Sequence, residues 1–216
     1  MTRSHTIRVN ATIESYSIDR SGGRLVRHVR HRDGRQTQSS VRLVGGDVGK
    51  SPLSDAYDHA WLRSPKKPRE ANGEEECRIV DLFSGCGAMS IGVFEACRAL
   101  GLRTNVILGM DIDVGAGAVF QRAFPKADFD DRPLQSVIDR PLGAVPSESE
   151  RKLQRKLGSV DVLVGGPPCQ GHSDLNNHTR RVDEKNALFD RMARFAELAR
   201  PSHVIVENVK VAEAPR

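Results

Sequence analysis

From Cys77 onward, short apolar runs rich in β-branched residues alternate with segments of helical periodicity, and this alternation restricts the fold most. The apolar runs are 78–83, 105–110, 160–164 and 203–209, and two of them lead directly into glycine turns. Strands that alternate with helices build parallel sheets covered by helices on both faces. We therefore predict an α/β fold with a doubly wound parallel sheet, in which the strand before Glu207 has an exposed apolar edge.

The segments between these strands carry helix signals. Apolar residues recur at helical spacing in 90–100, 114–124 and 186–199, and Gly101 and Pro125 stop the first two. Ser147 and Glu150 form a capping-box pattern that opens a basic helix to Leu157. We expect 126–146 to be irregular.

Residues 1–76 differ from the rest. Thr6–Tyr16 alternates as a half-buried strand does, Arg24–His31 reads as a return strand, and 53–62 as a short helix before a polar linker. This part holds 14 Lys and Arg against 10 Asp and Glu, and so most of the net charge of +5. We predict an N-terminal extension and linker over 1–76 and a catalytic domain over 77–216. A variable extension is favoured over a DNA-contacting arm, because charge runs discriminate weakly.

Composition excludes several classes. No run approaches the length of a membrane helix, and the N-terminus leads into no signal-like stretch. We therefore expect no membrane partner. The four cysteines have neither C-x-x-C spacing nor a paired histidine motif, so we expect no metal site and no disulfide framework. The expected location is intracellular: cytoplasm or nucleoid, or the nucleus in a eukaryote.

The first glycine turn, Gly85-Cys-Gly87, stands between a strand and a helix. Such a turn brings bare backbone and helix N–H groups against a ligand. Asp111 follows the next strand, 24 residues beyond Gly87, where an acid can hold ribose hydroxyls. The alternative is that these glycines only allow helix and sheet to pack closely.

The second turn is Gly165-Gly-Pro-Pro-Cys169, and its prolines make the loop rigid. Most cysteines are core residues, which suits Cys86 and Cys97 in packing or turn roles. It suits Cys169 poorly, since loops after parallel strands are where catalytic groups gather. Glu207 and Asn208 follow the last strand, where burial without a partner would raise the pKa of the carboxyl; otherwise Glu207 is an ordinary strand-end acid.

Together, Asp81-Leu-Phe-Ser-Gly-Cys-Gly87, Gly165-Gly-Pro-Pro-Cys-Gln-Gly-His-Ser173 and Glu207-Asn-Val resemble, in this order, three hallmark motifs of cytosine-5 DNA methyltransferases. The resemblance covers about residues 78–210, and 180–189 resembles an intervening motif. Ala88 and His172 depart from the common pattern. They stand where many members have a glycine and an aromatic residue.

The resemblance implies S-adenosylmethionine as cofactor and a fold of the Rossmann-like methyltransferase kind. It implies that Cys169 adds to C6 of a flipped-out cytosine while Glu207 hydrogen-bonds or protonates N3. The cofactor-binding residues it implies are Phe83, Ser84, Gly85, Gly87, Asp111 and Pro168. Gln170, Ser173 and Asn208 would belong to the substrate pocket. Asp128, Asp130 and Asp131 compete for the role of the adenine-contacting acid.

Family members continue beyond the Glu-Asn-Val strand with a Gln-x-Arg-x-Arg strand and a target-recognition domain, and no Gln-x-Arg-x-Arg occurs here. We therefore expect a truncated enzyme or one subunit of a split enzyme. Its partners would be double-stranded DNA and a complementary C-terminal chain carrying the recognition domain. Two alternatives stay open: an RNA cytosine-5 methyltransferase of the same family, and an inactive fragment that binds cofactor or nucleic acid.

Overall fold

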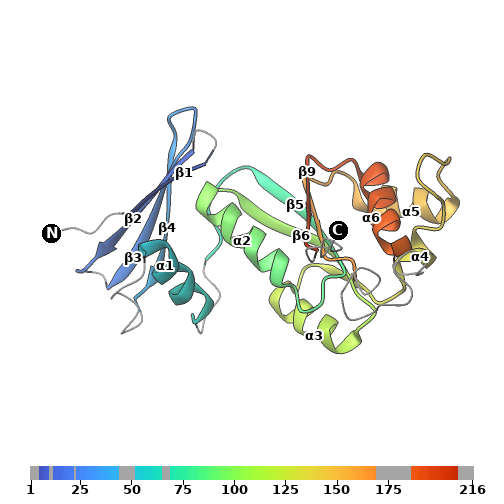
Figure 1. Ribbon diagram of the computed structural model, residues 1–216, viewed down its shortest axis with the longest axis horizontal. Helices are drawn as coiled ribbons and strands as arrows, with labels where there is room; N and C mark the ends of the chain where they lie inside the picture. The colour runs from blue at the N-terminus through green and yellow to red at the C-terminus, as the bar shows by residue number, and fades with distance from the viewer. Residues whose placement is uncertain are drawn as a thin grey trace, which may run out of the picture. The chain divides into compact units, whose positions relative to one another are not determined.

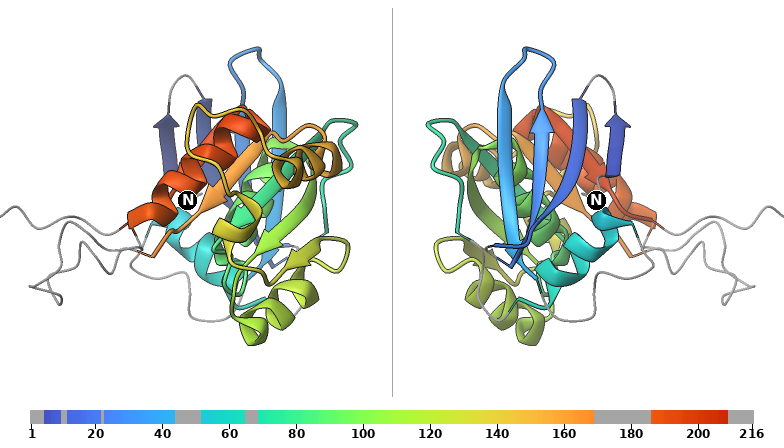
Figure 2. Two further views of the ribbon diagram at one scale, coloured as in Figure 1. Left: turned by 90° about the vertical axis from the view of Figure 1, so that its right-hand side faces the viewer. Right: turned by 90° about the vertical axis from the view of Figure 1, so that its left-hand side faces the viewer.

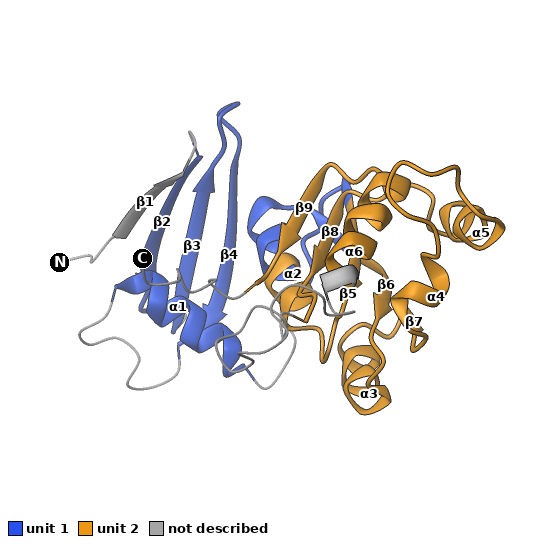
Figure 3. Cartoon of the chain, turned by 45° about the vertical axis from the view of Figure 1, so that its right-hand side comes forward, with its two compact units in different colours: residues 1–76, 94–104 blue, residues 77–93, 105–216 orange. Residues whose placement is uncertain are grey.

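The computed structural model describes residues 5–9, 12–21, 23–43, 52–64, 69–168 and 186–208, with only the backbone for 5–9, 186 and 187. The chain forms two compact units (Figure 3). The first comprises 1–76 with 94–104, and the second comprises 77–93 with 105–216. Among the described residues, no helix is both long and apolar enough to cross a membrane.

The first unit contains a four-stranded antiparallel sheet in the order β1-β2-β3-β4 (Figure 1). The strands are β1 (His5–Val9), β2 (Thr12–Asp19), β3 (Arg24–Arg30) and β4 (Gln36–Arg42). The prediction of a single strand over 6–16 was wrong, because the chain reverses between Val9 and Thr12 and pairs β1 with β2. The return strand is confirmed as β3. β4 was not predicted, because most of its residues are polar.

Helix α1 (Leu53–Leu62) covers one face of this sheet, and its predicted bounds are confirmed. The apolar cluster between them is formed by Tyr16, Leu25, Val41, Leu53, Ala56, Tyr57 and Ala60. A polar network adjoins this cluster. The Tyr57 hydroxyl donates to Glu95 at 2.9 Å and accepts from Arg98 at 2.7 Å, and it lies 2.8 Å from the Ser39 hydroxyl.

The second unit contains a parallel five-stranded sheet in the order β7-β6-β5-β8-β9. Its strands are β5 (Glu76–Leu82), β6 (Arg103–Met110), β7 (Asp128–Asp130), β8 (Val162–Gly165) and β9 (His203–Val206). The chain builds outward from β5 through β6 to β7, then returns to the other side of β5 with β8. The strand order therefore reverses between β5 and β8, the position at which open α/β sheets bind ligands.

Helices cover both faces of this sheet, as predicted (Figure 1). α2 (Ala88–Leu100) and α3 (Val114–Ala123) lie on one side; α4 (Leu134–Val137), α5 (Glu148–Leu157) and α6 (Asn186–Ala199) lie on the other. The predicted capping box at Ser147 and Glu150 is confirmed. Residues 126–146 are not wholly irregular, since they include β7 and α4. Both elements are too short to show periodicity.

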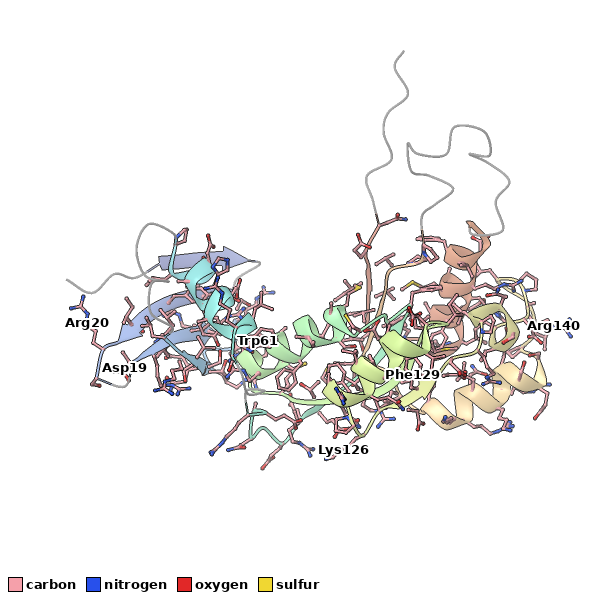
Figure 4. All side chains as sticks on the ribbon, turned by 90° about the horizontal axis from the view of Figure 1, so that it is seen from below. Asp19, Arg20, Trp61, Lys126, Phe129 and Arg140 are labelled. Atoms are coloured by element: carbon pink, nitrogen blue, oxygen red, sulfur yellow. The ribbon has the colours of Figure 1, made fainter. Side chains whose placement is uncertain are left out.

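Close packing fixes α3 against the sheet. A Cβ added at Gly109 would overlap the ring of Phe120, and one added at Gly117 would overlap the ring of Phe129. Phe120 and Phe129 also contact each other, with ring centroids 5.8 Å apart, and Phe129 lies beneath α3 in Figure 4. These glycines therefore bring α3 and its phenylalanines directly onto β6 and β7.

A buried ion pair connects α5 to α6. The Glu150 side chain is fully buried and accepts from Arg194, which is 2% exposed, at 2.8 Å. Burial raises the pKa of Glu150, but hydrogen bonds from Arg194 and from the backbone of Ser147 and Arg140 outweigh it and hold the pKa below its ordinary value. The capping glutamate thus also holds α6 in place.

The expectation of an exposed apolar edge at the last strand is confirmed for the described sheet. β9 is the edge strand, and Val204, Ile205 and Val206 are 40–47% exposed. A run of three apolar residues is typical of a strand that is buried on both faces. An edge position, however, leaves side chains on both faces partly open whatever their polarity.

Candidate active site

An open cavity of about 350 Å³ lies at the carboxyl ends of the parallel strands. Leu82 and Phe83 border it from the end of β5, Met110 and Asp111 from the end of β6, and Gly166 from the end of β8. The cavity is thus at the reversal of strand order, and it includes the predicted residues Phe83, Asp111 and Pro168. Its other lining residues are Ile112, Arg132, Pro133, Leu134, Gln135 and Leu188.

The first glycine turn has an unusual backbone. Phe83 has a φ of 58°, which is rare for a residue with a Cβ, and Gly85 and Gly87 also have positive φ. The Ser84 N–H donates to the carbonyl of Met110 at 3.0 Å, which ties the turn to β6. A Cβ at Gly87 would lie 2.9 Å from the ring of Phe120, so this glycine is required for packing as well as for the turn.

Asp111 connects the turn to the second strand. Its Oδ2 accepts from the Gly85 N–H at 2.8 Å, and its Oδ1 accepts from the Asp113 N–H at 2.9 Å. Each carboxylate oxygen has a further lone pair for another donor. Asp111 therefore shapes the turn and borders the cavity at once, a double role that spacing alone did not indicate.

Two polar side chains at the first glycine turn are buried, those of Ser84 and Asp81. The Ser84 hydroxyl has no hydrogen-bond partner among the described residues. Asp81 is 1% exposed, and burial raises the pKa of its carboxyl to about 6, although the Ser90 side chain donates to it at 2.6 Å. A buried hydroxyl without a partner is costly and is commonly found where a ligand completes the site.

The second glycine turn lies directly beside Glu207. The Glu207 N–H donates to the carbonyl of Gly165 at 3.0 Å, and a Cβ at Gly166 would be 3.3 Å from Glu207 Oε2. A Cβ at Gly165 would also come within 2.8 Å of the Leu82 carbonyl and 2.9 Å of Met192. The two glycines therefore let the loop pass between β5, α6 and Glu207.

The described residues include some of the predicted catalytic and substrate-pocket residues and not others. Glu207 and Asn208 follow β9 and are exposed. Cys169, Gln170, Ser173 and His172 lie outside the described residues. Cys97 is buried, as expected for a packing role, whereas Cys86 is exposed in the first turn, which agrees with a turn role and not with a core position. The turn projects its side chain outward because the flanking glycines take positive φ.

The acids that follow β6, Asp128, Asp130 and Asp131, differ in their contacts. Asp128 forms an ion pair with Lys156 at 3.0 Å. Asp130 accepts from Arg132 at 2.7 Å, and this hydrogen bond holds the pKa of Asp130 below its ordinary value. Asp131 is exposed and immediately precedes Arg132, which lines the cavity.

A model of the family described as C-5 cytosine-specific DNA methylase matches residues 77–215. The chain belongs to this family. It is also 42% identical over 199 residues to the type II methyltransferase M1.BsuMI of Bacillus subtilis, a match that covers 91% of this chain and 46% of that protein. Because residues 77–216 are far fewer than 199, the match extends well into residues 1–76.

More distant relatives of the methylase family agree. The chain is 31% identical to the type II methyltransferase M.DdeI of Desulfomicrobium norvegicum, over 61% of this chain and 27% of that one. It is 29% identical to DNA (cytosine-5)-methyltransferase 1 of Mus musculus, over 69% of this chain and 9% of that one. This chain spans less than half the length of each of these three relatives.

C-5 cytosine methylases use S-adenosylmethionine, and the cavity fits this group. The buried Ser84 hydroxyl offers an unused donor and acceptor, and Asp111 offers lone pairs for hydroxyl groups. Ile112, 71% exposed, gives the cavity an apolar side chain that can pack on a flat ring. Sequence reasoning missed Ile112, although an apolar residue between Asp111 and Asp113 directly after a strand was a usable signal.

Proposed function

We propose that this chain provides the S-adenosylmethionine-binding and cysteine-nucleophile portion of a DNA (cytosine-5) methyltransferase. The observation that carries the proposal is the cavity at the strand-order reversal, which brings Phe83, Asp111 and Pro168 together in a member of the methylase family. The curated relatives named above are DNA methyltransferases or type II methyltransferases. They favour DNA over RNA as the substrate.

Phe83, Asp111, Ile112 and Pro168 would hold the cofactor. Asp111 would accept hydrogen bonds from the ribose hydroxyls while it keeps its bond to the Gly85 N–H. Ile112 would pack on the adenine, and the Ser84 hydroxyl would gain a partner at the methionine end. Bound in this way, S-adenosylmethionine supplies an electrophilic methyl group.

Asp131 is the best candidate for the adenine amino group. Asp128 and Asp130 already have cationic partners, so a new contact would have to compete with these ion pairs. Asp131 has no hydrogen bond or ion pair to another described residue. It precedes Arg132 at the cavity, and an exposed carboxylate is a ready acceptor for an amino group.

Cys169 would be the nucleophile, one residue after Pro168 at the cavity. The thiolate forms a bond to C6 of the cytosine, and the electron pair of the C5–C6 double bond moves onto the ring towards N3. Glu207 would hydrogen-bond or protonate N3 and so stabilise this charge. C5 then becomes nucleophilic. After C5 is methylated, loss of its proton and elimination of the thiolate restore the double bond and free Cys169.

Gln170, Ser173 and Asn208 would line the pocket for the base. Because C5 and C6 are stacked inside a duplex, the cytosine must leave the helix before Cys169 can reach it. The position of Glu207 supports this arrangement: the second glycine turn, which continues into Cys169, contacts Glu207 through Gly165 and Gly166.

Titration calorimetry with S-adenosylmethionine tests the cofactor site. Asp111→Asn keeps an acceptor for the Gly85 N–H but weakens the acceptor for the ribose, so we expect at least about tenfold weaker binding from the loss of a charge-assisted hydrogen bond. Asp190→Asn, at an exposed residue of α6, is the matched control. Unchanged affinity in Asp111→Asn would remove this residue from the site.

Covalent trapping tests the nucleophile. Duplex DNA that contains 5-fluorocytosine should form a stable adduct with the protein, because the fluorine cannot be removed as a proton is. Cys169→Ser should abolish the adduct and Cys86→Ser should not. The assay is run with the chain alone and with a family C-terminal fragment carrying Gln-x-Arg-x-Arg, which also tests for a complementary chain. Transfer of a labelled methyl group to RNA but not to DNA would reverse the choice of substrate.

A further inference from the structure

The first unit presents one polar sheet face that its helix does not cover. Along β3, Leu25 and Val29 are buried while Arg24, His28 and Arg30 are exposed; along β4, Ser39 and Val41 are buried while Gln36, Gln38 and Arg42 are exposed. Side chains alternate between the two faces of a strand. The buried set packs with α1, so the exposed set forms the opposite face, which we call the basic face (Figure 2, right).

The basic face is rich in cations and hydrogen-bond donors. Arg24, Arg30, Arg42 and His28 stand at its alternating positions on β3 and β4, and Ser15, Ser17, Ser40, Gln36 and Gln38 lie among them. On the described strands β2–β4, Asp19 is the one acidic residue at these positions, and its Oδ1 accepts from the Ser21 hydroxyl at 2.6 Å. Arg20, in the turn after β2, points outward beside Asp19 in Figure 4.

The register places like charges opposite each other. Arg24 on β3 is the cross-strand partner of Arg42 on β4 and, on its other side, of Asp19 on β2. Directly opposed like charges destabilise a sheet. Asp19 offsets one of these two cations, whereas Arg42 faces no carboxylate across the described strands. Neither Arg30 nor Arg42 has a hydrogen bond or ion pair to another described residue. The hydrogen bonds of Arg24 go to uncharged groups, the hydroxyl of Ser40 at 2.9 Å and its carbonyl at 3.2 Å.

A polar hollow of about 680 Å³ continues this face at the outer edge of β4. Arg24 and Ser40 border it from the sheet, and Arg69 and Asn72 border it from the segment that follows. Glu70 is the acid in its lining. Two exposed guanidinium groups with hydroxyl and amide neighbours can hold a phosphate.

We propose that the basic face binds the phosphate backbone of duplex DNA. From Arg24 to Arg30 the face spans about 20 Å along β3, which equals the length of about six base pairs. Arginines among serine and glutamine side chains are the usual backbone contacts of DNA-binding proteins. The contact is independent of sequence, so it adds affinity without selecting the target bases.

The inference rests on the proposed function only for the choice of DNA over other polyanions. The match to M1.BsuMI extends into residues 1–76, so the first unit resembles part of a type II methyltransferase. The charge itself is a property of the first unit alone. DNA binding can therefore be tested without measuring methyl transfer.

The experiment measures binding of the full chain to a short fluorescent duplex by anisotropy at several salt concentrations. The test variant is Arg24→Gln/Arg30→Gln/Arg42→Gln. The control, Arg151→Gln/Arg155→Gln/Lys156→Gln, removes the same charge from α5. Three phosphate contacts correspond to a loss of about 40-fold in affinity between about 50 and about 200 mM salt. We expect the test variant to lose this part of the salt dependence and the control to keep it.

Since Arg24 also donates to Ser40, the variant Arg30→Gln/Arg42→Gln serves as a second test that removes no described hydrogen bond. It should remove about two-thirds of the same salt dependence. Wild-type salt dependence in both variants, or equal weakening in the control, would overturn the proposal. So would tighter binding of an RNA duplex of equal length. Calorimetry with S-adenosylmethionine should give the same affinity for wild type and variants. A wild type that fails there contradicts the proposed function and leaves the DNA result standing.

Discussion

Asp81 should lower the stability of the folded protein at neutral pH, and Asp81→Asn should restore much of that loss. The carboxyl is 1% exposed beneath the first glycine turn, and burial raises its pKa from the ordinary 3.8 to about 6. The folded state therefore binds a proton more tightly than the unfolded state does. The difference corresponds to about 3 kcal/mol at 1.36 kcal/mol for each tenfold change in proton affinity.

The sign of this effect sets the pH window. Because the pKa of Asp81 is raised in the folded state, the protein keeps its full stability below about pH 4, where the carboxyl is protonated in both the folded and the unfolded state. The free energy of unfolding then falls as the pH rises through about 6. Above that range the ionised carboxylate carries the whole cost. Asparagine carries no charge and can still accept from the Ser90 hydroxyl, which donates to Asp81 at 2.6 Å. The variant should therefore gain up to about 3 kcal/mol at pH 7.

Urea unfolding followed by far-UV circular dichroism, at intervals from about pH 4 to about pH 8, measures this difference. The gain of Asp81→Asn over wild type should grow across the window and level off above about pH 7. Asp190→Asn, on the exposed surface of α6, should follow wild type. A variant less stable than wild type by the same amount at every pH would refute the argument, since it would mean that the carboxylate is ionised at no cost.

Three further experiments test the packing. Glu150→Ala should cost about 3 kcal/mol, because it removes the buried one of the two carboxylates that pair with the guanidinium of Arg194 and leaves only Glu197; adding Arg194→Met should recover part of this loss, and thermal unfolding measures both. Gly117→Ala should cost about 1–3 kcal/mol, as its Cβ would overlap Phe129, whereas Gly92→Ala on α2, where a Cβ meets open space, should gain up to about 1 kcal/mol. Tyr57→Phe should cost about 1–3 kcal/mol in urea unfolding, because the buried Glu95 and Arg98 lose a shared hydroxyl; a neutral result would mean that water replaces it.

Periodicity and turn residues predicted the architecture of the second unit. Long apolar runs gave the central strands, and the capping box at Ser147 gave the start of α5. The short elements β7 and α4 were not predicted, because three or four residues show no period. The first unit was harder. β4 is Gln-Thr-Gln-Ser-Ser-Val-Arg, and its strand character comes from pairing with β3 and from packing under α1.

The candidate site was also predicted only in part. Motifs identified Phe83 and Asp111, which the structure places on one cavity, and located the turn beside Glu207. They could not reveal Leu134, which comes to the cavity through tertiary packing. Nor could they show that Asp128 and Asp130 are already paired, since Lys156 lies on a different element from Asp128. That Cys169 lies within a few ångströms of Glu207 stays a prediction.

The hydrogen bond from Gly85 to Asp111 has a consequence for how this protein can change over evolution. The two residues are 26 positions apart, yet one carboxylate closes the glycine turn and also borders the cavity. A substitution at Asp111 therefore alters the turn, and a substitution in the turn alters the carboxylate, so their effects on ligand affinity should not add. A substitution at either position would then require a compensating substitution at the other. Among sequences of this family, the turn and the acid should accordingly vary as a pair.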